Sequence, residues 1–295
     1  MVDLTAGGPV DPPSRWLTSL ERGGQRLRFG GALVCILFLI ALLAPLLAPH
    51  DPIEQDLLSA QLPPAWMQGG EWTFPLGTDS LGRCVLSRLM FAARTAVAVA
   101  LIAASLAAAI GIAFGLVAGM FGGWIDQSVS RLIDVWMAFP PVLLSIVLAA
   151  VIGAGLTSVI AAIVVVDWTR FARVVRAETM AQLQRDYAAA ARVLGLNRTQ
   201  TLWLEILPNL VPLIVTLLAV EMGIAILVEV ILSFVGISVA GDVPTWGGMI
   251  VEGRQIVYQS PWIMALPIVC VILSVIGFNL LGDGLRAALD PVQSR

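Results

Sequence analysis

The chain has no lysine, a single histidine and only three cysteines. A phosphate-binding P-loop requires a lysine before its serine or threonine, so this chain cannot hold ATP in that way. The single histidine, His50, leaves a histidine-based metal cage or a Ser–His hydrolase without the residues it needs. Cys35 and Cys270 fall in apolar stretches and Cys84 stands alone, so their spacing indicates neither a disulfide framework nor a metal cluster. We therefore expect no enzyme, metal site or cofactor in this chain.

Charged residues are also scarce. They make up 13% of the 295 residues, against 58% hydrophobic residues, and the mean hydropathy is +0.91. A soluble domain has about a quarter of its residues charged. This composition predicts a multi-pass membrane protein.

Six apolar stretches are long enough to cross a bilayer, which needs ~20 mostly apolar helical residues. They are residues 31–48, 95–119, 133–152, 156–171, 210–237 and 262–281. Pro140 and Pro141 are expected to kink the third stretch, and Asp167 interrupts the short fourth. The sequence thus predicts an all-α fold with six transmembrane helices.

The distribution of arginine predicts the orientation. With both termini cytoplasmic, Arg83, Arg88, Arg94 and Arg254 lie outside and the remaining arginines lie inside. This asymmetry satisfies the positive-inside rule. We therefore expect a membrane-spanning region at 31–285, between a flexible cytoplasmic tail at 1–30 and a cytoplasmic C-terminal tail at 286–295. Segments 49–94 and 238–261 would be extracytoplasmic, the second lying on the membrane or capping an outer vestibule.

Residues 179–208 form a polar, alanine-rich cytoplasmic segment that we expect to fold as a hairpin of two short amphipathic helices. In the first helix the predicted apolar face opposes Gln182, Gln184, Arg185, Asp186 and Arg192, and consists of Met180, Leu183, Tyr187, Ala190, Ala191 and Leu194. Gly195 should end this helix in a left-handed conformation, and Asn197 with Gln200 predicts a capping box. The second helix should carry Leu202, Trp203 and Ile206 on its apolar side and stop at Pro208. Such a hairpin suits either a docking site for another protein or an ordinary connector.

The spacing in this hairpin is similar to a known motif. Ala189-Ala190-Ala191, three residues, Gly195, nine residues and Glu205-Ile206-Leu207-Pro208 resemble the EAA motif of ABC importer permeases, which receives the ATPase subunit. The motif's acidic residue corresponds to Ala189, so an ion pair with the ATPase would have to come from Asp186 or Glu205. The resemblance implies a set of coupling residues: Asp186, Tyr187, Ala189, Ala190, Ala191, Arg192, Gly195, Leu196 and Pro208.

Further segments resemble the dipeptide, oligopeptide and nickel permease family, specifically its C-type subunit. They are Pro75 to Arg83 with Ser87-Arg88 and Arg94-Thr95, Ser233 to Gly236, Pro244 to Gly247, Glu252-Gly253-Arg254, Phe278 to Arg286, and Leu289-Asp290-Pro291. Cys84 stands where that pattern usually has aspartate. The resemblance implies a type I ABC importer permease fold in the bacterial cytoplasmic (inner) membrane, so that residues 31–285 would be a permease domain. It also implies a homologous B-type permease partner, one or two ATPase subunits that bind the ATP and Mg2+, and an extracytoplasmic substrate-binding protein. Nucleic acid is not an expected partner.

Three residues are candidates for the translocation path. Charged residues inside a bilayer usually face a protein interior or a water-filled path, which applies to Glu221 and Glu229, although a buried hydrogen-bonded carboxylate is the plainer interpretation. Pro140 is the third, because irregular backbone at membrane depth is tolerated only beside protein or a cavity. Gly111, Gly115 and Gly119 repeat every four residues and predict a close helix–helix contact, within this chain or with its partner.

The function expected from these observations is that of a permease subunit importing peptides through an ABC system. The same family also imports nickel chelates, glutathione and opines, which the sequence does not separate. An ion-driven secondary transporter, with Glu221 as its proton site, would be equally hydrophobic but would not need the hairpin. A membrane-embedded enzyme is disfavoured by the missing lysine and the single histidine.

Overall fold

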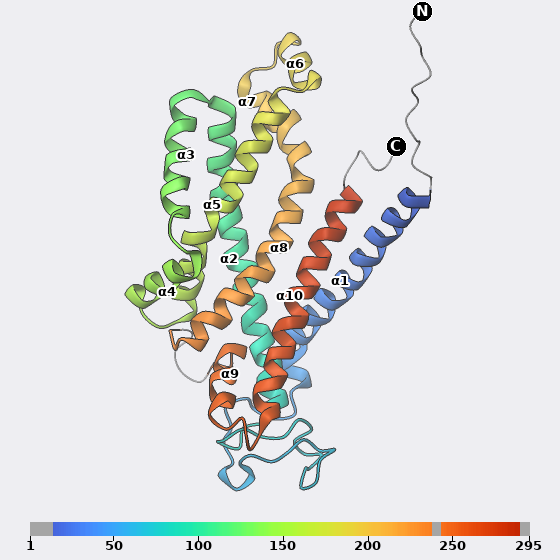
Figure 1. The fold of residues 1–295 in the computed structure, drawn as a ribbon, viewed down its shortest axis with the longest axis vertical. Coiled ribbons are helices and arrows are strands. Elements are labelled where there is room, and N and C mark those ends of the chain that lie inside the picture. The colour runs from blue at the N-terminus through green and yellow to red at the C-terminus, as the bar shows by residue number, and fades with distance from the viewer. Residues whose placement is uncertain (1–13, 238–242, 290–295) are drawn as a thin grey trace, which may run out of the picture.

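In the computed structural model the chain is a bundle of long helices, and the structure describes residues 14–237 and 243–289. No β-strand occurs among these residues. The elements are α1 (Ser14–Leu47), η1 (Leu57–Ser59), α2 (Val85–Phe121), α3 (Gly123–Met137), α4 (Pro141–Ile152), α5 (Leu156–Leu183), α6 (Asp186–Val193), α7 (Arg198–Thr201), η2 (Leu202–Ile206), α8 (Leu207–Phe234), α9 (Trp246–Gln255) and α10 (Pro261–Leu289). Figure 1 shows their arrangement.

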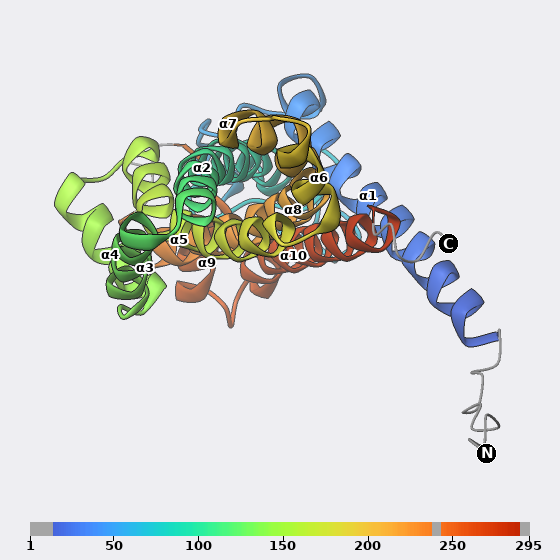
Figure 2. The same cartoon turned by 90° about the horizontal axis from the view of Figure 1, so that it is seen from above.

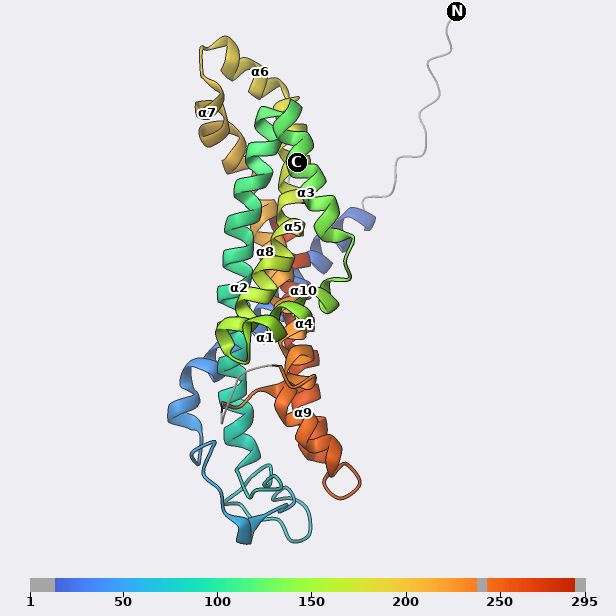
Figure 3. The ribbon, with the colours of Figure 1, turned by 90° about the vertical axis from the view of Figure 1, so that its left-hand side faces the viewer.

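The bundle has two distinct ends. The α6–α7 hairpin projects from one end, while the segment between α1 and α2, together with α9, covers the other (Figures 1 and 3). The described ends of the chain, at the start of α1 and the end of α10, lie towards the hairpin end. This arrangement agrees with the predicted topology, although which end faces the cytoplasm stays a prediction.

α2 is the central helix of the bundle. It packs against α5, α8 and α1, and α1 in turn lies along α10. Seen from above, α1 and α10 form one side of the molecule and α3 with α4 the other (Figure 2). Alanines dominate the buried face of α2, which allows its neighbours to approach closely.

Glycines make the closest helix contacts. A Cβ added at Gly111 would lie 2.3 Å from the Trp168 carbonyl oxygen, and one at Gly119 would lie 2.7 Å from the Thr179 Cβ. Gly115 faces the same helix, α5. The predicted glycine contact is therefore confirmed, and it lies inside this chain, between α2 and α5.

The candidate membrane spans differ in number from the prediction. Within the part of the chain that the structure describes, four helical segments are long and apolar enough: Gly24–Leu47, Val85–Phe121, Arg198–Phe234 and Pro261–Leu289. α3 and α4 add a fifth if they count as one span, bent by 85° at the break before Pro141. The predicted kink is thus a true break in the helix. α5 is long enough but carries Asp167, Arg170 and Arg173 within its apolar half, so six crossings stay a prediction.

Several boundaries also differ. α1 begins at Ser14, so residues 14–30 of the predicted flexible tail are helical, and α10 continues to Leu289. The predicted outer segment 238–261 contains α9, whose Trp246 is buried and donates a hydrogen bond from Nε1 to the Leu89 carbonyl rather than lying at a membrane interface. Residues 1–13, 238–242 and 290–295, which the sequence assigned to the two tails and this segment, lie outside the described residues.

Candidate functional site

The predicted hairpin is present and connects two of the longest helices. α5 ends at Leu183, two residues separate it from α6, and Asn197 begins a second arm that runs without interruption through α7 and η2 into α8. Its two arms are therefore α5 with α6, and α7 with η2 and α8. Figure 3 shows the hairpin projecting beyond the rest of the bundle. A force on the hairpin is transmitted directly to α5 and α8.

The turn of the hairpin forms as the sequence predicts. Gly195 has a φ of +90°, a left-handed conformation that a β-branched residue would strain, and the Leu196 N–H donates to the Ala191 carbonyl at 3.1 Å. Asn197 Oδ1 accepts from the Gln200 N–H at 2.8 Å, and Gln200 Oε1 accepts from the Asn197 N–H at 3.0 Å. The predicted helix end and capping box are both confirmed.

The first helix of the hairpin is broken where the sequence predicts continuity. Because the chain turns at Gln184 and Arg185, Tyr187 and Gln182 are not on opposite faces but in contact: the Tyr187 hydroxyl donates to Gln182 Oε1 at 2.7 Å. Gln182 Nε2 donates in turn to Glu178 Oε1 at 2.7 Å. Partial burial raises the pKa of the Tyr187 hydroxyl, which keeps it protonated as the donor. This relay fixes the angle between α6 and α5.

The second helix also differs from the prediction, because it does not stop at Pro208. It continues through η2, a π-helical turn in which the Leu207 N–H bonds to the Leu202 carbonyl. Pro208, which has no backbone N–H to donate, follows directly after this π turn, in the first turn of α8. The hairpin and the membrane helix are consequently one continuous rod.

The apolar residues of the hairpin divide into a buried and an exposed set. Ala188, Ala191, Leu202 and Ile206 are buried, the last two in a cluster with Leu116, Met120, Val175 and Leu210. The exposed set, called the apolar tip below, comprises Val193 (88% exposed), Leu194 (80%), Trp203 (59%) and Leu204 (63%). Leu194 and Trp203, which the sequence places on the apolar faces of the two helices, are thus exposed. Large exposed apolar side chains on both arms of a projecting hairpin are typical of a protein-binding surface.

The structure brings the predicted coupling residues together at this projecting end. Asp186, Ala189, Ala190, Gly195 and Pro208 are exposed. Tyr187 and Leu196 are half-buried, and Ala191 packs inward. Arg192 lies in α6, and its side chain is outside the described atoms. Their part in coupling stays a prediction.

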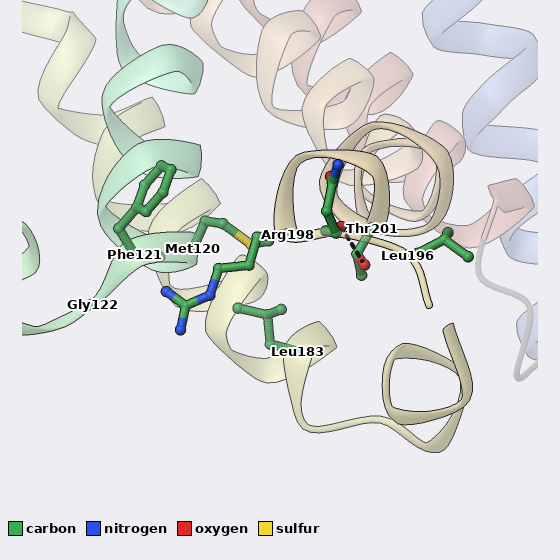
Figure 4. Close-up of a pocket in the computed structure, with 9 residues that line it drawn as sticks. Met120, Phe121, Gly122, Leu183, Leu196, Arg198 and Thr201 are labelled. Atoms are coloured by element: carbon green, nitrogen blue, oxygen red, sulfur yellow. Dashed lines mark hydrogen bonds between the residues drawn. The ribbon is translucent and has the colours of Figure 1, made fainter. Parts of the chain in front are cut away.

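Two hollows flank the hairpin. One, of about 430 Å3, lies between the end of α2 and the second arm, where Met120, Leu183 and Arg198 face one space (Figure 4). The other, of about 670 Å3, lies between both arms and the end of α10, and is lined by Glu178, Arg185, Tyr187, Asn209 and Arg286 among others. The hairpin thus stands clear of the bundle on both sides.

The three predicted path residues occupy different places. Glu221 is buried in α8 with Arg170 Nη1 of α5 at 3.6 Å from its Oε2. Glu229 is buried eight residues further along α8 and accepts a hydrogen bond from the Ser233 hydroxyl at 2.6 Å. Pro140 is exposed at the break before α4. Path lining stays a prediction for each of them.

Sequence reasoning missed an ionic cluster at the other end of the bundle. Arg83 Nε lies 2.7 Å from Asp79 Oδ2, and its Nη2 lies 2.8 Å from Glu252 Oε2. Arg88 pairs with the same two carboxylates. Asp79 and Arg88 are almost fully buried, whereas Glu252 is one-third exposed. These four residues connect α9 to the start of α2. All four belong to the segments that resemble the permease family, and this shared membership was the sequence signal for the cluster.

No group of three or more histidine, cysteine, aspartate or glutamate side chains that could hold a metal occurs in the described ranges 14–237 and 243–289.

Comparison with known proteins agrees with this architecture. Residues 111–295 match the family described as binding-protein-dependent transport system inner membrane component, and residues 28–64 match the N-terminal transmembrane domain of oligopeptide transport permease C. The di/tripeptide transport system permease protein of Pseudomonas aeruginosa is 37% identical, with 89% of this chain and 87% of the relative covered.

Two further relatives cover nearly as much or more. The dipeptide transport system permease protein of Escherichia coli is 38% identical over 98% of this chain and 96% of its own length. The glutathione transport system permease protein of Pectobacterium atrosepticum is 36% identical over 88% and 85%. These matches lead to one conclusion: the chain belongs to the binding-protein-dependent ABC importer permeases, within the C-type branch of the dipeptide, oligopeptide and nickel family.

Proposed function

We propose that this chain is one half of the pore of an ABC importer for short peptides in the inner membrane of a bacterium. A homologous B-type permease supplies the other half, and one or two separate ATPase subunits bind the hairpin. A substrate-binding protein delivers the peptide to the opposite, extracytoplasmic end. The observation that carries the proposal is the projecting hairpin with its apolar tip, in a chain that lacks a P-loop lysine.

The hairpin supports a mechanical role. When the ATPases bind ATP and close, they displace the hairpin, and its two arms carry the movement to α5 and α8. The relay from Tyr187 to Glu178 keeps α6 at a fixed angle to α5 during this displacement. The long helices then rock between inward-facing and outward-facing arrangements, so that the translocation path opens alternately to the two sides of the membrane.

Co-purification tests the proposal. The chain is tagged, extracted in detergent from its native membrane and compared with Gly195→Val, in which a β-branched residue cannot adopt the φ of +90°. Gly153→Val is the matched control, because Gly153 also has positive φ and open space around it but lies in the α4–α5 turn away from the hairpin. We expect the wild type and the control to retain a permease and P-loop ATPases, and Gly195→Val to lose the ATPases alone. A wild-type complex without any ATPase would overturn the proposal and favour an ion-driven transporter.

Glutathione is a second candidate substrate, because a glutathione permease covers 88% of this chain at 36% identity. Uptake of a labelled tripeptide, measured in competition with either unlabelled dipeptide or glutathione, separates the two. Competition by dipeptide but not by glutathione supports the peptide assignment, and the reverse result replaces it.

A further inference from the structure

The two arms of the hairpin meet deep in the bundle at three ionisable side chains. Asp167 and Arg170 belong to α5, and Glu221 belongs to α8. Asp167 is 2% exposed and Glu221 is 1% exposed, whereas the Arg170 side chain is 32% exposed. Arg170 Nη2 lies 3.7 Å from Asp167 Oδ1, and its Nη1 lies 3.6 Å from Glu221 Oε2. One guanidinium thus faces two buried carboxyl groups.

The surrounding helices supply no second positive charge to this group. α2 from Thr95 to Phe121 and all of α4 contain no ionisable residue. In the described part of the bundle, Arg170 is the arginine that lies within ion-pair distance of Asp167 and Glu221. None of the other described side chains on elements packed against α5 and α8 forms an ion pair with either carboxyl group. The ionisable residues on these elements are Arg88 and Arg94 on α2, Asp126, Arg131 and Asp134 on α3, Asp186, Tyr187 and Arg192 on α6, Glu205 on η2, Glu252 and Arg254 on α9, and Cys270, Asp283 and Arg286 on α10.

Asp167 and Glu221 cannot both be ionised at the same time without a large cost in free energy. Two carboxylates and one guanidinium leave one negative charge in excess, and burying an unpaired charge costs several kcal/mol even after relaxation. A proton taken up by the carboxyl pair removes this excess. The sum of the charges at the three side chains is then zero.

The hydrogen-bonding pattern points to the same proton. Both oxygens of Glu221 are buried and no donor lies within hydrogen-bond distance of either. The polar group beside Glu221 is Asp167, close enough for a side-chain hydrogen bond. Ionised carboxylates only accept, so these two groups can bond to each other only if one of them carries a proton.

We propose that Asp167 and Glu221 hold one proton between them and, with Arg170, form a neutral buried joint between the two arms of the hairpin. The joint keeps α5 in register with α8, so that displacement of the hairpin moves both arms together. Asp167, Arg170 and Glu221 are positioning residues in this role, and the role rests on the proposed function, whereas the shared proton does not.

Infrared spectroscopy of the purified complex in H2O and D2O tests the proton. We expect the wild type to show a protonated-carboxyl C=O band that is absent from both Glu221→Gln and Asp167→Asn, because either change leaves one carboxylate paired with Arg170. Asp134→Asn is the matched control, since Asp134 is 66% exposed and also pairs with an arginine, Arg173, at 3.5 Å. A band that survives in both variants, or no such band in the wild type, overturns the proposal.

Transport per ATP hydrolysed tests the positioning role. We expect both single variants to stay close to wild type, and the double variant Asp167→Asn/Glu221→Gln to fall by about tenfold or more, because it leaves Arg170 without a partner. Adding Arg170→Gln to the double variant restores neutrality and should recover transport. A triple variant no better than the double refutes the charge balance. Loss of ATPase binding in the wild-type complex would instead defeat the proposed function and leave the infrared result standing.

Discussion

Substitution of Gly111 by alanine tests the close contact between α2 and α5. The added Cβ would lie 2.3 Å from the Trp168 carbonyl oxygen, 2.5 Å from the Phe171 Cβ and 2.9 Å from the Ala172 nitrogen. A carbon next to a carbonyl oxygen normally stays about 3.3 Å away, so the two helices must separate by about 1 Å. Two of the three atoms belong to the α5 backbone and cannot rotate aside.

The expected loss follows from this overlap. Overpacking of a tight interior typically costs 1–3 kcal/mol, and a backbone clash belongs at the upper end, about 3 kcal/mol. Alanine in place of glycine also favours the helix by about 1 kcal/mol. We therefore expect Gly111→Ala to lower the free energy of unfolding by about 2 kcal/mol, and the melting temperature by about 4 °C.

Gly31→Ala is the matched control. Gly31 lies in α1 with no atom within 4 Å of its added Cβ, so this variant gains the helix preference without the clash. Thermal unfolding of the two purified variants in one detergent measures the difference directly. If Gly111→Ala melts at the same temperature as Gly31→Ala, the two helices are not in contact at this glycine and the reasoning fails.

Three further predictions concern other parts of the molecule. Asp79→Asn leaves the buried Arg88 with a partly exposed partner, which should cost about 3 kcal/mol and lower the melting temperature, whereas Asp51→Asn at an exposed site should not. Trp203→Ala should weaken recovery of the ATPase without changing the melting temperature, since Trp203 is 59% exposed; loss of thermal stability would show that it packs inside. Tyr187→Phe removes the donor to Gln182 and should reduce transport per ATP hydrolysed while ATPase binding persists; unchanged coupling would show that the relay does not fix α6.

The sequence was sufficient for the features that depend on local chemistry. Gly195, the Asn197–Gln200 capping box and the glycine contact at Gly111 follow from backbone conformation, side-chain reach and residue spacing, and all three are present. The apolar segments were also found, although α2 extends well beyond the predicted 95–119 because helices continue past the hydrocarbon region.

Features that depend on distant contacts were not predictable from the sequence. The helical spacing places Trp203 on one side with Leu202 and Ile206, but in the π turn of η2 Leu202 and Ile206 are buried and Trp203 is exposed. The Tyr187–Gln182 contact requires the helix break at Gln184, which no proline or glycine marks. The Arg88–Glu252 pair joins residues 164 positions apart, a proximity that only the folded chain creates.

The second arm of the hairpin is one continuous helix from Arg198 to Phe234, and the π turn of η2 is the point about which it can tilt. From Leu207 to Phe234 it has 28 residues, or about 42 Å at the usual rise, and the π turn of η2 lies at its near end. A tilt of about 10° at that turn moves the far end by about 7 Å, on the order of the width of a peptide side chain. A small displacement of the hairpin about this turn would therefore produce a larger displacement at the end of α8 farthest from the hairpin.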